Sequence, residues 1–283
     1  MRLSLPFLLP LVAFGLLQPV LARAGETLPE RDLKKIVEQE RRLLESSAKQ
    51  GDKLDPEAFR VQAQEICHDY ELLLHDSPNY ALAYADYGHL LYKLGMSKAA
   101  VGMMLKADQL DPSIPLVKNQ IGDYLAEAGK PLEAVNYFLA AIKLAPDEPL
   151  YHYQLGQLLY TARDDFIKSG DWSRAQVDDA MHHAFQRAAE LAPDRIEFTF
   201  RYAESFADMD KPDWDGALKA WAALEEKSKT QLDRETMRLE AANVLIKQGR
   251  FPAARLLLAT VTVPALNGQK QKLVAQLPAV PAK

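Results

Sequence analysis

Cysteine is almost absent from this chain of 283 residues, which contains a single one, Cys67. One cysteine excludes an intrachain disulfide framework and every zinc site built from several cysteines. A basic excess is also missing, because 34 Lys and Arg stand against 39 Asp and Glu, for a net charge of −5. Nucleic-acid binding needs a basic surface, so we expect no nucleic-acid partner.

Long apolar runs are absent after the first 24 residues. Residues 1–24 have the features of a secretory signal peptide: Arg2, the apolar run 3–21, and the small-x-small sequence Ala22-Arg23-Ala24. We predict cleavage after Ala24, a mature chain that begins at Gly25, and a periplasmic or secreted protein. A membrane anchor is the alternative, but three prolines interrupt the run, and the prediction includes no transmembrane anchor after cleavage.

Prolines recur at a fixed step of 34 residues, at Pro78, Pro112 and Pro146. Each of these prolines follows an amphipathic pattern that indicates a helix, and the proline would end that helix. The same step relates further residues of similar size: Gly88, Gly122 and Gly156; Gly95 and Gly129; Ala100 and Ala134; Met104 and Phe138; Ala107 and Ala141. A period of this length indicates a stack of helical hairpins.

The segments Tyr84-x2-Tyr87-Gly88-x2-Leu91 and Ala134-x3-Phe138-x2-Ala141-x4-Pro146 closely resemble the tetratricopeptide-repeat consensus. The resemblance covers nearly all of the mature chain. It implies an all-α fold, a right-handed α-solenoid of about six helical hairpins with a C-terminal capping helix. Small residues such as Gly122 would let the two helices of a hairpin approach closely, and a bulky side chain there would overpack the contact.

The expected organisation follows from the phases of the repeat. Residues 25–80 would form a degenerate hairpin, with Asp55 as cap and Pro56 as first residue of its second helix. Residues 81–262 would form the repeat array and 263–283 a capping helix and tail. The units of the array are 81–114, 115–148, 149–195, 196–232 and 235–262.

The unit 149–195 is 13 residues longer than the period, because its closing Pro193 would otherwise stand at 180. With Gly170 as the turn residue, each helix gains about two turns. We predict helices near 149–168 and 173–191, with Phe166 and Val177 buried between them. A disordered loop is the alternative.

In tetratricopeptide arrays, the first helix of each hairpin lines a concave groove that binds ligand. The resemblance therefore implies these groove residues: His89, Tyr92, Asn119, Asp123, Tyr153, Gln157, Tyr160, Phe200, Glu204 and Asn243. Aromatic rings and amides suit an extended peptide. The alternative is that these side chains are solvated and only help the helices to pack. Truncation of Tyr153 with Tyr160 is expected to weaken partner binding and to spare the fold.

The family's Lys/Asn/Arg pattern for clamping a C-terminal carboxylate is missing, since Ala85 and His89 stand at two of its positions. A cationic or neutral peptide is therefore expected, and an acidic C-terminal tail is not.

Catalytic chemistry has little support, because the chain carries no nucleophile elbow, phosphate loop or dinucleotide fingerprint. Asp178, Asp179, His182 and His183 have a helical spacing that could hold a metal, which leaves a metal-binding or enzymatic role of the 149–195 hairpin as the alternative. The run from Asp208 to Gly216 fails as a calcium loop and indicates an acidic turn. Cys67 is expected to be a core residue.

The sequence thus predicts a non-enzymatic adaptor or scaffold of the cell envelope, without a cofactor, which binds a protein or peptide in the groove. A purely structural assembly subunit is a third possibility.

Overall fold

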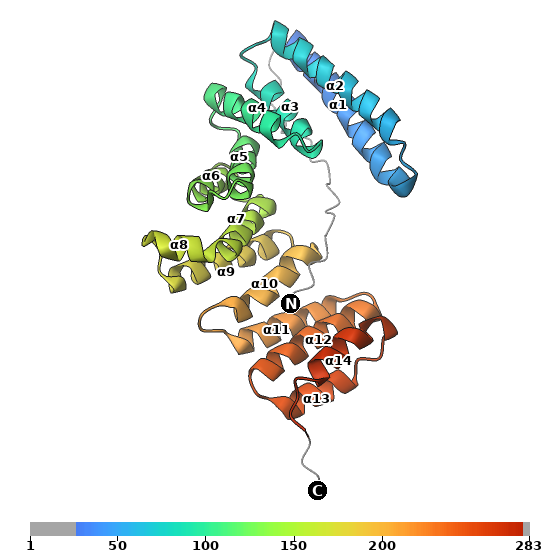
Figure 1. Cartoon of the computed structure of the whole chain (residues 1–283), viewed down its shortest axis with the longest axis vertical. Helices are drawn as coiled ribbons and strands as arrows, with labels where there is room; N and C mark the ends of the chain where they lie inside the picture. The colour runs from blue at the N-terminus through green and yellow to red at the C-terminus, as the bar shows by residue number, and fades with distance from the viewer. Residues whose placement is uncertain (1–26, 280–283) are drawn as a thin grey trace. The chain divides into compact units, whose positions relative to one another are not determined.

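The computed structural model describes residues 27–279, and the signal peptide predicted over 1–24 lies outside the described residues. Within 27–279 the chain forms fourteen α-helices and two short 3-10 helices, with no strand (Figure 1). The predicted all-α solenoid is therefore confirmed. None of the helices in this range is both long and apolar enough to cross a bilayer.

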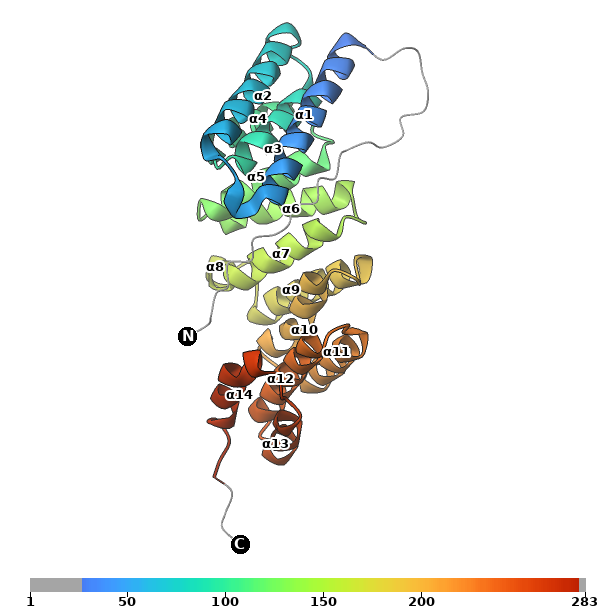
Figure 2. The ribbon, with the colours of Figure 1, turned by 90° about the vertical axis from the view of Figure 1, so that its right-hand side faces the viewer.

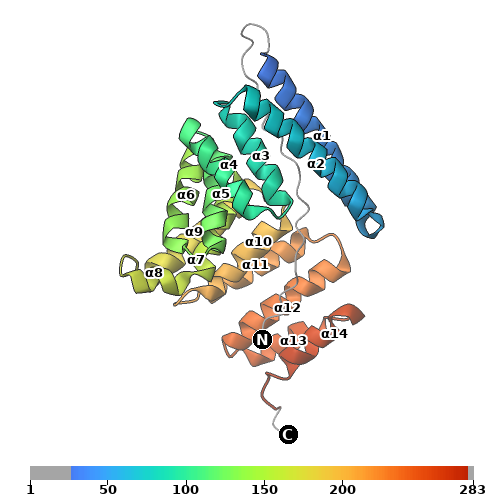
Figure 3. The same cartoon turned by 45° about the horizontal axis from the view of Figure 1, so that its top comes forward.

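The chain divides into two compact units, 1–112 and 113–283. The helices of the first unit are α1 (Leu28–Gln50), α2 (Pro56–Asp76), α3 (Ala81–Lys93) and α4 (Ser97–Leu110). Helices α1 and α2 pack side by side, as Figure 3 shows, and α3 packs on α4. Helix α2 begins as expected, with Asp55 accepting hydrogen bonds from the first turn and Pro56 as its first residue.

A buried polar cluster joins three helices of the first unit. Glu40 of α1 accepts a hydrogen bond from the Tyr70 hydroxyl of α2 at 3.1 Å and pairs with Lys93 of α3 at 3.3 Å. The Tyr70 ring stacks on Tyr87, with ring centroids 5.1 Å apart. Desolvation raises the pKa of Glu40, although the attraction of Lys93 opposes it.

The second unit contains ten α-helices within the described range. They are α5 (Pro115–Glu127), α6 (Pro131–Leu144), α7 (Pro149–Thr161), α8 (Arg163–Ser169), α9 (Arg174–Leu191), α10 (Ile196–Asp208), α11 (Trp214–Lys227), α12 (Gln231–Lys247), α13 (Phe251–Ala259) and α14 (Asn267–Val274). The hairpin pairs are α5–α6, α7–α9, α10–α11 and α12–α13, and α14 packs against α12 and α13 (Figure 2). Helix α12 starts at Gln231, ahead of the unit boundary expected at 235.

The repeating glycines mark the points where the two helices of a hairpin meet. A Cβ atom on Gly122 would lie 3.0 Å from the Phe138 ring, and one on Gly156 would lie 2.7 Å from the Phe185 ring. These distances explain why the sequence keeps the smallest residue at a fixed phase.

The long hairpin of 149–195 is helical, but its first half is not one continuous helix as predicted. The helix breaks at Ala162, whose φ and ψ are −102° and 19°, and continues as α8. Gly170 takes the turn with a φ of 84°, and Phe166 and Val177 are fully buried, as expected. Beyond the break, Arg163 reaches Asp178 of α9 at 2.8 Å, and Phe166 contacts the Trp172 ring edge-on.

Candidate functional site

The first helices of the second unit carry a row of polar and aromatic side chains that interact from helix to helix. We call this row the first-helix face. Its members are Asn119 and Asp123 of α5; Tyr153, Gln154, Gln157 and Tyr160 of α7; Arg201 and Glu204 of α10; and Glu240 and Asn243 of α12. Seven of the ten residues predicted from the sequence belong to it.

The α5 end of the face is an amide–carboxylate cluster. Asp123 accepts hydrogen bonds on Oδ2 from Gln154 Nε2 at 2.7 Å and from Asn119 Nδ2 at 3.4 Å. Asn119 is only 1% exposed. Burial raises the pKa of Asp123 to about 7, and the negative charge of Glu127 adds to the effect.

Arg201 occupies the centre of the face, and the phases of the repeat did not predict it. Its guanidinium is buried and lies over the Tyr160 ring, with Cζ 4.1 Å from the centroid. It donates to Asp208 Oδ2 at 2.8 Å and to Gln157 Oε1 at 3.4 Å. The sequence does carry one signal for this role of Arg201: Glu204 and Asp208 follow it at helical spacing, which places all three on one face of α10.

Tyr153 is both a member of the face and a packing residue. Its ring centroid lies 4.8 Å from that of Phe198 and 5.8 Å from that of Phe185, which is fully buried. Its hydroxyl accepts a hydrogen bond from Gln157 Nε2 at 3.2 Å. These contacts argue against the expectation that Tyr153 can be truncated without affecting the core, because its ring packs against two buried phenylalanines.

The structure places three of the predicted residues elsewhere. Phe200 packs edge-on against the Trp221 ring, at 4.7 Å, within the core between α10 and α11. His89 and Tyr92 both lie on α3 of the first unit and are partly buried. These three are not members of the first-helix face.

At the far end of the face, Glu240 of α12 is partly buried. Desolvation and the neighbouring Glu204 raise its pKa to about 7, while Lys247 and a hydrogen bond from Asn243 oppose the shift. The face therefore carries two carboxyl groups that are held partly protonated near neutral pH.

Two of the four residues considered for a metal, Asp178 and His182, serve as packing and hydrogen-bonding groups. Asp178 is buried and is held by Arg163, by Arg174 at 2.7 Å and by the backbone N–H of Asp210 at 2.7 Å. The His182 ring packs against the rings of Tyr202 and Phe206, with Nδ1 2.8 Å from Ser205 Oγ. Among residues 27–279, no group of three His, Cys, Asp or Glu side chains is placed to hold a metal ion.

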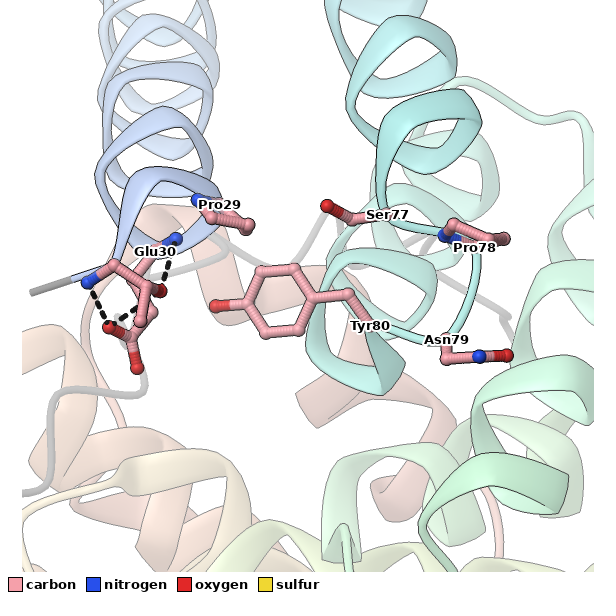
Figure 4. Close-up of a pocket in the computed structure, with 7 residues that line it drawn as sticks. Pro29, Glu30, Ser77, Pro78, Asn79 and Tyr80 are labelled. Carbon is pink, nitrogen blue, oxygen red and sulfur yellow. Dashed lines mark hydrogen bonds between the residues drawn. The ribbon is translucent and has the colours of Figure 1, made fainter.

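An open hollow lies in the first unit between the start of α1 and the loop that joins α2 to α3 (Figure 4). It is lined by Thr27, Pro29, Glu30, Ser77, Pro78, Asn79 and Tyr80. The Glu30 carboxylate is committed to the capping box of α1, since it accepts from Thr27 N at 2.8 Å and from Thr27 Oγ1 at 2.9 Å. We assign no ligand to this hollow.

Comparison with known proteins places the chain by its fold. No protein-family model matches the sequence, and no curated protein matches it. Among solved structures, YrrB, described as a TPR protein with an unusual peptide-binding site, superposes with a TM-score of 0.59 at 17% identity, over 73% of this chain and 97% of that one.

Two further structures cover more of the chain. PilW, described as a type IV pilus biogenesis factor, gives a TM-score of 0.57 at 13% identity, over 89% of this chain and 100% of its own. PilF of Pseudomonas aeruginosa superposes with a TM-score of 0.54 at 14% identity, over 86% of this chain and 99% of the PilF chain. The stacked hairpins predicted from the 34-residue period are those of the tetratricopeptide-repeat fold, to which this chain belongs.

Proposed function

We propose that the protein is a non-enzymatic adaptor that binds an extended segment of a partner protein on the first-helix face, and that it works in the cell envelope. The observation that carries the proposal is the continuity of this face. Its side chains interact across α5, α7, α10 and α12, so one extended peptide could touch all four helices.

The chemistry of the face suits a peptide. The partly exposed amides of Gln157 and Asn243 can bond a peptide backbone, and the Tyr160 ring offers contact area at a low entropic cost. The fold supports the same function, because YrrB is described as having a peptide-binding site. For this chain, the peptide site is a proposal that the following experiment tests.

A photo-crosslinking amino acid at position 160 tests where the partner sits. Benzoylphenylalanine in place of Tyr160 keeps an aromatic ring and should crosslink the partner in cells of the native host. The matched control is the same amino acid at Leu139, which is 46% exposed on the second helix α6. Crosslinking from position 139 and not from 160 would move the binding surface to the second helices and contradict the proposal.

The envelope location rests on the signal-peptide features of residues 1–24. We predict that the exported protein begins at Gly25, which N-terminal sequencing measures. Thr27 and Glu30, which cap α1, remain in the mature chain. The substitution Ala24→Arg removes the small residue before the cleavage site and should block processing. Recovery of wild-type protein from washed membranes with Met1 intact would contradict this prediction.

A further inference from the structure

The cluster of Asn119, Asp123 and Gln154 leaves two of its acceptor oxygens without a donor. Both amide nitrogens donate to the same carboxylate oxygen, Asp123 Oδ2, at 3.4 Å and 2.7 Å. Asn119 Oδ1 and Gln154 Oε1 are buried and accept no hydrogen bond. A buried acceptor without a donor is uncommon in a native protein and calls for a physical explanation.

The cluster also lacks a positive charge. Within the described part of the chain, no Lys, Arg or His pairs with Asp123, and the charge that acts on it is that of Glu127, one turn further along α5. Buried carboxylates are normally paired. Both observations favour a ligand that is cationic and donates several hydrogen bonds.

We propose that Asn119, Asp123 and Gln154 receive the ε-ammonium group of a lysine in the bound peptide, an inference that rests on the proposed function. An ammonium group carries three N–H donors. The cluster offers three acceptors: Asp123 Oδ1, Asn119 Oδ1 and Gln154 Oε1. A guanidinium fits less well, because its planar fork prefers both oxygens of a carboxylate, and two amides already occupy Oδ2.

The rest of the face agrees with a cationic ligand. Glu204 and Glu240 lie further along it, and its one arginine, Arg201, is engaged by Asp208 at 2.8 Å. Burial holds the pKa of Asp123 at about 7. A bound ammonium would stabilise the ionised carboxylate, so binding should release protons below pH 7 and should strengthen as the pH rises from 6 to 8.

The test is an NMR titration of the full mature chain with Nα-acetyl-lysine methylamide. The expected result is a saturable shift of the side-chain amide signals of Asn119 and Gln154. The Nε-acetylated form of the probe has no charge and should bind at least about tenfold more weakly, because a charge-assisted hydrogen bond is lost. The same loss is expected for Asp123→Asn, whose affinity should also no longer depend on pH.

Glu127→Gln is the matched control: it removes a neighbouring charge but none of the three acceptors, so this variant should still bind the lysine probe saturably. Equal binding of the acetylated probe, or unchanged binding to Asp123→Asn with a normal melting curve, would overturn the proposal. So would a stronger response of the same signals to K⁺ or Ca²⁺ alone, which would indicate a metal site. If the lysine probe binds but position 160 does not crosslink the partner, the site stands and the adaptor function fails. If crosslinking succeeds without lysine binding, the adaptor function stands and the lysine site fails.

Discussion

At Gly156 the backbone of α7 runs directly against a fully buried ring of α9. A Cβ atom there would lie 2.7 Å from Cε1 and 2.8 Å from Cδ1 of Phe185. The Phe185 ring is fully buried and has Tyr153 and the Arg201 guanidinium packed against it, so it has little room to move. We expect Gly156→Ala to lower the free energy of unfolding by about 1–3 kcal/mol, as overpacked core substitutions do. Urea unfolding followed by circular dichroism measures this.

Gly102→Ala is the control for Gly156→Ala. Gly102 lies inside α4 and has no heavy atom within 4 Å of a Cβ built on it. Alanine is favoured over glycine in a helix by about 1 kcal/mol, so this variant should be as stable as the wild type or more stable. A similar loss in both variants would show that packing at Gly156 is not the cause.

The two parts of Tyr153 have separable roles. Its ring packs against Phe185 and Phe198, and its hydroxyl accepts from Gln157. Tyr153→Ala should cost about 2 kcal/mol or more of stability, because it leaves a cavity in the core. Tyr153→Phe keeps the ring and should unfold almost as the wild type does. Comparable melting temperatures for the alanine variant and the wild type would contradict a packing role.

Individual residues also show where sequence reasoning stops. The assumption of an extended hairpin with Gly170 at its turn predicted that Phe166 and Val177 are buried between its helices, and both are fully buried. The phases of the repeat could not reveal that Tyr153 is shared between core and surface. They also gave no role to Arg201, because its burial depends on partners, such as Asp208 and the Tyr160 ring, that meet only after folding.

At the scale of elements, the helix starts were predictable where the chain supplies its own cap. Asp55 and Pro56 begin α2 as expected, because the cap chemistry is local. The break at Ala162 was not predictable, since no proline or glycine stands there. It coincides with contacts made by α8, where Arg163 donates to the backbone carbonyl of Asp208, 45 residues away. Such long-range partners are invisible to a helical period.

The C-terminal cap of the array is held by one carboxylate of α12. Glu235 is 2% exposed and accepts hydrogen bonds on Oε2 from the backbone N–H groups of Thr262 and Val263, at 2.6 Å and 2.7 Å. On Oε1 it accepts from the Thr262 hydroxyl at 2.9 Å. These bonds tie the segment before α14 to α12. They lower the pKa of Glu235 to about 2, with the Val263 N–H as the largest cause.

The low pKa of Glu235 predicts how this cap responds to acid. The bonds stabilise the folded state above the ordinary glutamate pKa of 4.5, and this stabilisation is lost as the pH falls toward 2. Amide hydrogen exchange of 262–274 should therefore be faster in Glu235→Gln than in the wild type at neutral pH. In the wild type, exchange of the same segment should accelerate only in acid. Glu226→Gln, an exposed change on α11, should leave this exchange unchanged. Slow exchange in Glu235→Gln would show that α14 is held by its apolar contacts alone.

At the scale of the whole molecule, three carboxyl groups within residues 27–279 have a pKa raised to about 7 by burial: Asp86 in the first unit, and Asp123 and Glu240 in the second. In the unfolded chain these groups ionise near 4. Between pH 4 and pH 7 the folded state therefore binds more protons than the unfolded state, and stability falls as the pH rises. Burial lowers the pKa of His152 and His182, which acts in the opposite direction below pH 6.5.

A comparison of variants separates these opposing effects. In the triple variant Asp86→Asn, Asp123→Asn and Glu240→Gln the amides cannot ionise, while both histidines remain. The wild type should lose stability relative to this variant as the pH rises from 5 to 8, which urea midpoints at several pH values measure. A constant difference across this range would show that the three carboxyl groups reach enough water to ionise normally. The lysine site at Asp123 would then lose the electrostatic part of its support, since a solvated carboxylate has no need of a buried cation.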